Sequence, residues 1–147
     1  MPKLITPNTG ILVSVAGTNP AAGADWSQTV TANKRWRIQS IRFQLVTDAT
    51  VATRTVRILF TDGTNTFFLL PAVDVQIASL TYNYECVVDG YQRALHVPGV
   101  GAPSAFIPIP NNLWLTGGYV MRTSTINLQA GDDFGAPRFL VEELGYA

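Results

Sequence analysis

Apolar and polar residues alternate with a period of two along most of this chain, most clearly in residues 33–60. A period of two is typical of β-strands with one buried face. The apolar positions of the first half of this stretch are Trp36, Ile38, Ile41, Phe43 and Leu45. Their parity changes by one residue near Ser40. An extra residue in a strand moves every later side chain to the other face, so this change predicts a β-bulge.

A second alternating run covers residues 55–60, after the turn-like residues 47–50. Val56, Ile58 and Phe60 share one face of this run, and Arg57 belongs to the other. We expect the two runs to form an antiparallel pair with one face buried and the other carrying arginines. This arrangement is common in sandwiches and barrels that have one solvated face.

Further strand-like runs follow, with turn residues every 8 to 12 positions. They cover residues 11–15, 25–31, 66–70, 80–88, 91–97, 113–115, 119–122, 125–129 and 137–144. Asp62-Gly63 predicts a hairpin turn before residues 66–70, because glycine tolerates positive φ. Pro71 should end that strand or place it at a sheet edge. Many short strands without a long helix or an internal repeat predict a β-sandwich, jelly roll or small barrel.

Two segments are less regular. Residues 72–79 fit either a short helix or a strand, and a strand or loop is favoured. Residues 98–110 contain four prolines, which remove backbone donors, so a long loop or an edge segment is expected there. The large apolar residues of this second segment either pack under the domain or dock onto a partner.

The fold class that follows is all-β, with a single antiparallel β-sandwich or jelly-roll-like domain. We place this domain at residues 24–147, after an N-terminal arm at residues 1–23 that contains one short strand. The arm is rich in Pro, Gly, Thr and Asn. It is either an ordinary frayed terminus or a segment that orders against a neighbouring subunit.

Charge changes this picture in two ways. Charged residues make up only 14% of the chain and the formal net charge is zero, so nucleic acid and anionic membrane are not expected as main partners. Basic residues cluster at positions 34–57 and acidic residues at positions 132–143. These clusters are either solvated faces or complementary patches between subunits. No apolar run is long enough for a membrane-spanning helix or a signal peptide, so a soluble product made in the cytoplasm is expected.

The residue types needed for catalysis are sparse. Cys86 is the only cysteine and alternates with apolar neighbours, which favours a buried small hydrophobe over a reactive thiol. His96 is the only histidine and has no Gly-x-Ser-x-Gly motif beside it. Glu142 and Glu143 are adjacent on an expected strand, so they should point to opposite faces and not act as a catalytic pair.

Cofactor sites are equally poorly supported. Asp132 and Asp133 lie in a glycine-bracketed turn, but the spaced ligand pattern of a calcium loop is missing. Residues 99–104 lack the third glycine of a dinucleotide-binding motif. A sugar-stacking platform is one reading of Trp26, Trp36, Trp114 and the tyrosines, but aromatics at alternate strand positions are more often core. The sequence therefore predicts a protein without catalysis, metal or cofactor.

Four stretches of the chain resemble small β-rich structural proteins of tailed bacteriophages. They are residues 22–25, 34–41, 45–54 and 127–133, and the resemblance spans most of residues 22–143. It implies a virion component, and the size and all-β pattern resemble those of capsid decoration (cement) proteins. Such proteins sit as trimers on the outer shell and brace neighbouring capsomers. The resemblance contains no diagnostic motif and assigns no contact residues.

We therefore expect a virion protein on the capsid surface whose partners are the major capsid protein and two further copies of itself. Cementing needs many modest contacts repeated by symmetry, and no chemistry. The contact residues expected from composition and placement are Leu4, Ile5, Ile11 and Val13 of the arm, Phe106, Ile107 and Ile109 of the proline-rich loop, and Arg35, Arg37, Arg54 and Arg57.

Two alternatives remain open at this stage. One is a receptor- or carbohydrate-binding virion module that uses exposed aromatics such as Trp114 and Tyr119. The other is a head-to-tail or tail adaptor protein, which would be present in far fewer copies per particle.

Overall fold

The computed structural model describes residues 10–88 and 95–145 of the chain. It is all-β, as the alternation predicts, with no helix among the described residues. The strands are β1 (Ile11–Ala16), β2 (Ser27–Thr29), β3 (Lys34–Val46), β4 (Arg57–Thr61), β5 (Thr66–Pro71), β6 (Thr81–Val88), β7 (Ser104–Ile109), β8 (Trp114–Thr116), β9 (Val120–Thr123), β10 (Asp133–Phe134) and β11 (Arg138–Gly145).

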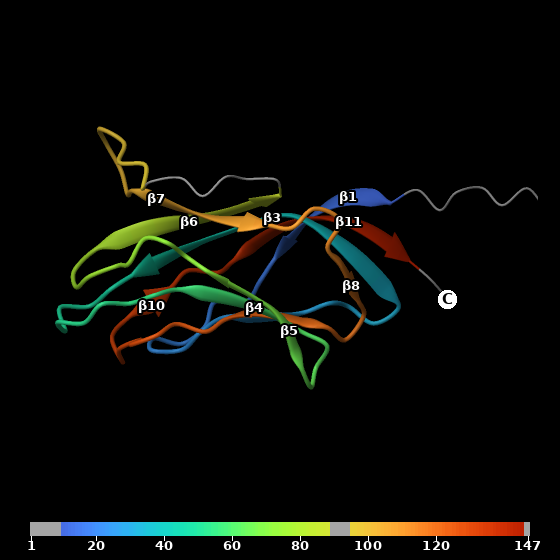
Figure 1. The fold of residues 1–147 in the computed structure, drawn as a ribbon, viewed down its shortest axis with the longest axis horizontal. Coiled ribbons are helices and arrows are strands. Elements are labelled where there is room, and N and C mark those ends of the chain that lie inside the picture. The colour runs from blue at the N-terminus through green and yellow to red at the C-terminus, as the bar shows by residue number, and fades with distance from the viewer. Residues whose placement is uncertain (1–9, 89–94, 146–147) are drawn as a thin grey trace, which may run out of the picture.

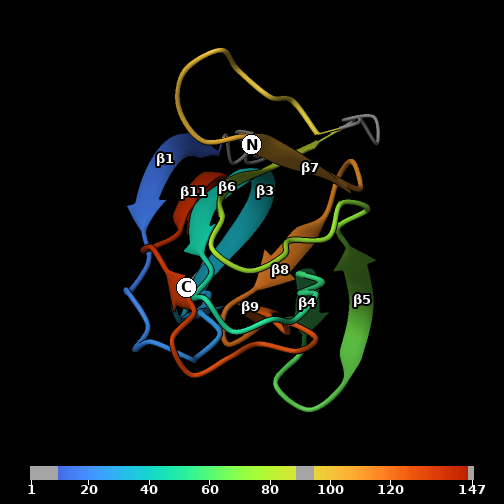
Figure 2. The same cartoon turned by 90° about the vertical axis from the view of Figure 1, so that its left-hand side faces the viewer.

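Two sheets form the layers of a sandwich (Figure 1). The larger sheet has the order β1-β11-β3-β6-β7, and β8 and β10 also pair with β3. The smaller sheet has the order β2-β9-β4-β5. All these pairs are antiparallel except β6 with β7, which run parallel. Figure 2 shows β4, β5 and β9 of the smaller sheet gathered on one side, with β1, β3, β6 and β11 on the other.

Strand β3 is the centre of the larger sheet and contains the predicted bulge. Leu140 of β11 lies opposite Ser40, whereas the next residue, Val141, lies opposite Ile38, so no residue of β11 lies opposite Gln39. Because of this shift, the buried positions are even-numbered up to Ile38 and odd-numbered from Ile41 onward. The bulge prediction is therefore confirmed at the residue where the sequence placed it.

The predicted pairing of β3 with β4 is wrong, because the two strands belong to different sheets. The connection between them, residues 47–56, crosses from one layer to the other and does not form a tight turn. Ile58, Leu59 and Phe60 of β4 are all buried, so this strand has no solvated arginine-bearing face over its middle residues. Arg57 instead lies at the start of β4 and donates hydrogen bonds to Ser124.

The hairpin prediction is confirmed. Strands β4 and β5 pair around the turn at residues 62–65, with Gly63 at a φ of 99°. Pro71 is the last residue of β5, and β5 is an edge strand, which fits the missing proline donor. Residues 125–129 were expected to be a strand. Within the described part of the chain they form no ladder and make one isolated bridge, from Ile126 to Thr55, and Ile126 is exposed.

The N-terminal strand is part of the larger sheet. All six residues of β1 pair with β11, and Val13 and Val15 pack against the core. Residues 104–109 of the proline-rich segment form β7, the opposite edge strand. Residues 91–94 of the expected strand 91–97 lie outside the described residues, and His96 makes an isolated bridge to Ser104.

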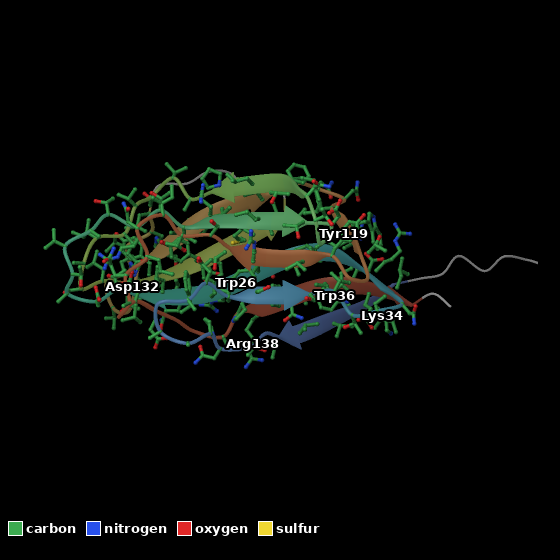
Figure 3. The ribbon with its side chains drawn as sticks, turned by 90° about the horizontal axis from the view of Figure 1, so that it is seen from below. Trp26, Lys34, Trp36, Tyr119, Asp132 and Arg138 are labelled. Atoms are coloured by element: carbon green, nitrogen blue, oxygen red, sulfur yellow. The ribbon has the colours of Figure 1, made fainter. Side chains whose placement is uncertain are left out.

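Aromatic rings join the two layers around Phe43. Its ring stacks on Tyr84 at a centroid distance of 5.0 Å and meets Trp26 edge-on at 5.4 Å. Trp26 in turn contacts Phe139 at 5.5 Å. These rings lie at the middle of the core, where Figure 3 shows Trp26 between the two ends of the long axis. Offset and edge-on pairs of this kind stabilise a core beyond simple area burial.

A fully buried arginine fixes one end of the sandwich. Arg54 donates from Nε and Nη2 to the two carboxylate oxygens of Asp132, both at 2.9 Å, and from Nη2 to Asp48 at 2.8 Å. Its Nη1 donates to the carbonyls of Thr50 and Ala52 at 3.0 and 2.8 Å. Every guanidinium nitrogen is therefore satisfied, as a buried cation requires. The pair ties the crossover at residues 47–56 to the loop before β10.

Asp132 is also the acceptor for two backbone groups. Its carboxylate accepts from the N–H of Asp48 at 2.9 Å and of Gln129 at 2.8 Å. Burial alone would raise the pKa of Asp132, but the hydrogen bonds from Arg54 and the two backbone donors outweigh it and lower that pKa. The ionised form is thus the one that the folded chain stabilises.

The first prediction concerns the strength of this pair. Asp132→Asn leaves the buried guanidinium of Arg54 with only Asp48 as an anionic partner. We expect it to lower the free energy of unfolding by about 3–5 kcal/mol, measured by urea denaturation. Glu85→Gln is the matched control, because its partner Arg42 is largely exposed and the change should cost under about 1 kcal/mol. Equal effects of the two variants would contradict the assignment.

The second prediction concerns acid. A lowered pKa of Asp132 in the folded state means that its contribution is complete above the ordinary aspartate value and is lost as the pH falls through the folded value. Glu143 adds to this loss, because hydrogen bonds from Trp36 and Lys34 also lower its pKa. Stability should therefore decline below about pH 4. Melting temperatures measured from pH 7 to pH 2 test this expectation. The melting temperature of Asp132→Asn should fall less steeply with acid, because this variant lacks the carboxylate that is protonated.

Candidate interaction surfaces

Exposed apolar side chains gather at the edge strand β5 and in the segment that follows it. We call the following six residues the apolar segment, with exposed fractions between 38% and 57%: Phe67, Phe68, Leu69, Val73, Val75 and Ile77. Asp74 is the only charged residue between positions 66 and 80. Large apolar side chains without interspersed charge mark protein contact surfaces more often than solvated ones.

The geometry of β5 explains why both of its faces are exposed. It is the last strand of the smaller sheet, so one backbone edge has no partner strand among the described residues. Its register shifts opposite Thr61, which leaves Phe67 between two paired positions. Phe67 contacts Phe68 and Tyr119 at centroid distances of 6.0 and 5.7 Å. The strand therefore presents an aromatic edge to its surroundings.

The exposure of the apolar segment was not predicted from the sequence. A signal for it was present, because the run Phe67-Phe68-Leu69-Leu70 breaks the alternation that the other strands follow. A continuous apolar run indicates burial on both faces of a strand. In the structure, however, Phe67, Phe68 and Leu69 are exposed on the edge strand β5.

The second candidate surface is an arginine–tryptophan cluster where β3, β8 and β11 meet. Arg35 and Arg37 lie over the ring of Trp114, with guanidinium carbons 5.2 and 5.5 Å from its centroid. Arg37 also forms an ion pair with Glu142 and donates to Asn112 at 3.2 Å. Two cations already cover this ring, so less of Trp114 remains for a sugar to stack on.

The expected interface residues fall into different environments. Ile11 is 70% exposed on the edge strand β1, whereas Val13 is half-buried against the core. Arg35 is exposed, and Arg37 and Arg57 are half-buried with partners in their own chain. The remaining arm residues Leu4 and Ile5 lie outside the described residues.

Three expected contact residues are buried in the folded chain, which corrects their expected placement. Arg54 is fully buried, because its guanidinium forms an ion pair with Asp132 where the chain crosses between the layers. Ile107 and Ile109 are 1% and 2% exposed, since β7 pairs with β6 and turns alternate residues into the core. Phe106 is on the opposite face of β7 and half-buried. Of this segment, only Phe106 remains a candidate contact.

The basic and acidic clusters of the sequence meet within the chain. Lys34 lies 3.0 Å from Glu143, Arg37 pairs with Glu142, and Arg54 pairs with Asp132. Antiparallel pairing of β3 with β11 brings the first two together, and Figure 3 shows Lys34 and Asp132 at opposite ends of the long axis. Much of the charge that complementary patches between subunits would use is therefore paired inside one subunit.

No catalytic constellation occurs among the described residues. His96 is exposed, and its backbone bridges Ser104 at the edge of the larger sheet. Cys86 is fully buried on β6, and burial raises the pKa of its thiol well above the ordinary value, which disfavours the reactive thiolate. Within the described ranges, no group of three His, Cys, Asp or Glu side chains could hold a metal ion. The same ranges contain no helix that could cross a membrane.

Comparison with known proteins adds little. No family model and no curated protein matches this chain. Among solved structures it is similar to the chain described as "Structure of PfGH50B", with a TM-score of 0.37 and 6% identity over 93% of this chain and 23% of that one. It is similar to an exo-beta-agarase with a TM-score of 0.33 and 8% identity, over 97% of this chain and 24% of that one. The chain thus spans about a quarter of each of these proteins, and the similarity carries no inference about its activity.

Proposed function

We propose that this protein is a capsid decoration protein of a tailed bacteriophage, which binds the outer shell as a trimer and braces neighbouring capsomers without catalysis. The observation that carries the proposal is the apolar segment at the edge of the smaller sheet. A β-sandwich whose most apolar exposed region lies at a strand edge is built to contact other proteins.

Three features support adhesion as the role. Asp74 is the only charged residue in the stretch 66–80 that holds the apolar segment, so desolvation of this stretch on contact costs little. The backbone edge of β5 has donors and acceptors that a neighbouring chain could pair. The charged residues elsewhere are largely paired inside the chain, so they favour solubility of the single subunit over strong attraction between subunits.

The resemblance of most of residues 22–143 to phage structural proteins supplies the biological setting of the proposal. A decoration protein is present in hundreds of copies, so each contact can be weak while the shell as a whole is stabilised by avidity. The apolar segment would then serve contacts between subunits of the trimer, and Ile11, Arg35 and Phe106 of the larger sheet would serve contacts to the major capsid protein.

The third prediction tests the apolar segment. Leu69→Ser combined with Ile77→Ser should convert a trimer into monomers in sedimentation equilibrium. Both side chains are about half exposed, so the melting temperature of the monomer should change little. Val51→Ser is the matched control, because Val51 is 95% exposed in the crossover loop outside the apolar segment. A wild-type chain that is monomeric at all concentrations, or a double variant that stays trimeric, would contradict the use of this surface.

The fourth prediction concerns the particle. Quantitative densitometry of purified virions should give hundreds of copies per particle for a decoration protein. About a dozen copies or fewer would instead support the adaptor alternative.

Capsids stripped of the protein should regain resistance to heat when the wild-type chain is added. The Leu69→Ser, Ile77→Ser chain should restore less of this resistance.

A further inference from the structure

A polar hollow of about 320 Å³ lies beside the β4–β5 turn on the outward face of the smaller sheet. Its lining consists of four hydroxyl side chains, one glycine, one valine and one guanidinium: Ser27, Thr61, Thr64, Thr66, Gly63, Val120 and Arg122. No carboxylate and no aromatic ring from residues 10–88 or 95–145 lines it. The volume is at the lower end of the range for small-molecule sites, but the lining is far more polar than usual.

The register of the sheet directs Arg122 into this hollow. On β9 it lies between Ser27 of β2 and Leu59 of β4, at an outward position that alternates with the buried Met121. The side chain is exposed and makes no hydrogen bond or ion pair in the described part of the chain. This contrasts with Arg42 on the larger sheet, which pairs with Glu85 at 2.9 Å.

The nearest acidic residue in the turn does not neutralise this cation. Asp62 does not line the hollow, and its Oδ1 accepts from the N–H groups of Thr64 and Asn65 at 2.8 and 2.7 Å. These backbone hydrogen bonds lower the pKa of Asp62, so it remains ionised and holds the turn in place. The turn is thereby ordered at the point where it borders the hollow.

The hydroxyl groups around Arg122 are also largely unused. Thr61 accepts one hydrogen bond, from the N–H of Gly63 at 3.2 Å. The hydroxyls of Ser27, Thr64 and Thr66 make none within the described ranges. A hydroxyl can donate and accept, so these groups can bind a ligand that itself carries several hydroxyls. The guanidinium presents paired donors that match a carboxylate.

We propose that this hollow binds an acidic sugar unit, a hydroxylated ring that carries one carboxylate. Arg122 holds the carboxylate, and Ser27, Thr64 and Thr66 exchange hydrogen bonds with ring hydroxyls. The absence of an aromatic platform makes the charge, and not stacking, the source of selectivity. The inference does not depend on the capsid role, because none of the residues that line the hollow belongs to the apolar segment.

The test is a titration of the full ¹⁵N-labelled chain followed by NMR. The probes are glucuronate and galacturonate, with glucose, galactose, acetate and inorganic phosphate as comparisons. We expect saturable shifts with a hexuronate, centred on the amides of Thr64, Thr66 and Arg122, and binding at least about tenfold weaker for the neutral hexoses, which lack the charge-assisted contact.

Two variants identify the anchoring residue. Arg122→Gln should weaken hexuronate binding by about tenfold or more. Arg138→Gln is the matched control, because Arg138 is also exposed and without a partner among the described residues, yet lies on β11 of the other sheet. It should bind as the wild type does. Thr64→Val should weaken the hexuronate more than it weakens acetate, since only the sugar offers hydroxyl partners.

Several results would overturn the proposal. No saturable shift at these amides with either hexuronate would remove the site. Equal affinity for acetate and hexuronate would reduce it to a carboxylate anchor that suits an acidic side chain of a partner protein. Tighter binding of phosphate than of the hexuronates would show that the hollow prefers another anion. Unchanged hexuronate binding by Arg122→Gln would show that the guanidinium does not hold the carboxylate. A failure here leaves the trimer and copy-number measurements unaffected.

Discussion

The backbone pairing of β3 is the constraint on which the rest of the structure depends. This strand has thirteen residues, and each buried N–H and C=O along it needs a partner. Four strands supply these partners, β6 and β10 beside its second half, β8 beside its first half and β11 along most of its length. Because β11 comes last in the chain, the larger sheet is complete only when the C-terminal strand has paired.

The bulge on β3 lets one strand serve two regions of the core. Before it, Trp36 and Ile38 face inward, and after it Ile41, Phe43 and Leu45 do so. A bulge also bends a strand and increases its twist, which helps a long strand follow a curved sandwich. At the far end of β3 the chain crosses to the other layer, where the Arg54–Asp132 pair holds the crossover together with isolated backbone bridges from Arg54 and Thr55.

The sequence predicted what depends on local alternation and turn chemistry. The bulge near Ser40, the β4–β5 hairpin at Asp62-Gly63 and the all-β class all follow from neighbours in the chain. It failed where partners are distant in sequence. Alternation cannot tell which sheet a strand joins, so β3 and β4 were wrongly paired, and it cannot distinguish an arginine destined for solvent from Arg54, whose carboxylate partner lies 78 residues away. The apolar run at residues 67–70 and the hollow around Arg122 required the edge and the register to be known.

The pairing of β1 with β11 also fixes where the described chain begins and ends. Ile11 lies opposite Glu143, and the same end of the sandwich holds Lys34, far from Asp132 (Figure 3). A protein fused upstream of Ile11 or downstream of Gly145 would therefore leave the body at one shared pole. Cargo joined at either junction would stand on the same side of every copy, at the pole away from the buried Arg54–Asp132 pair.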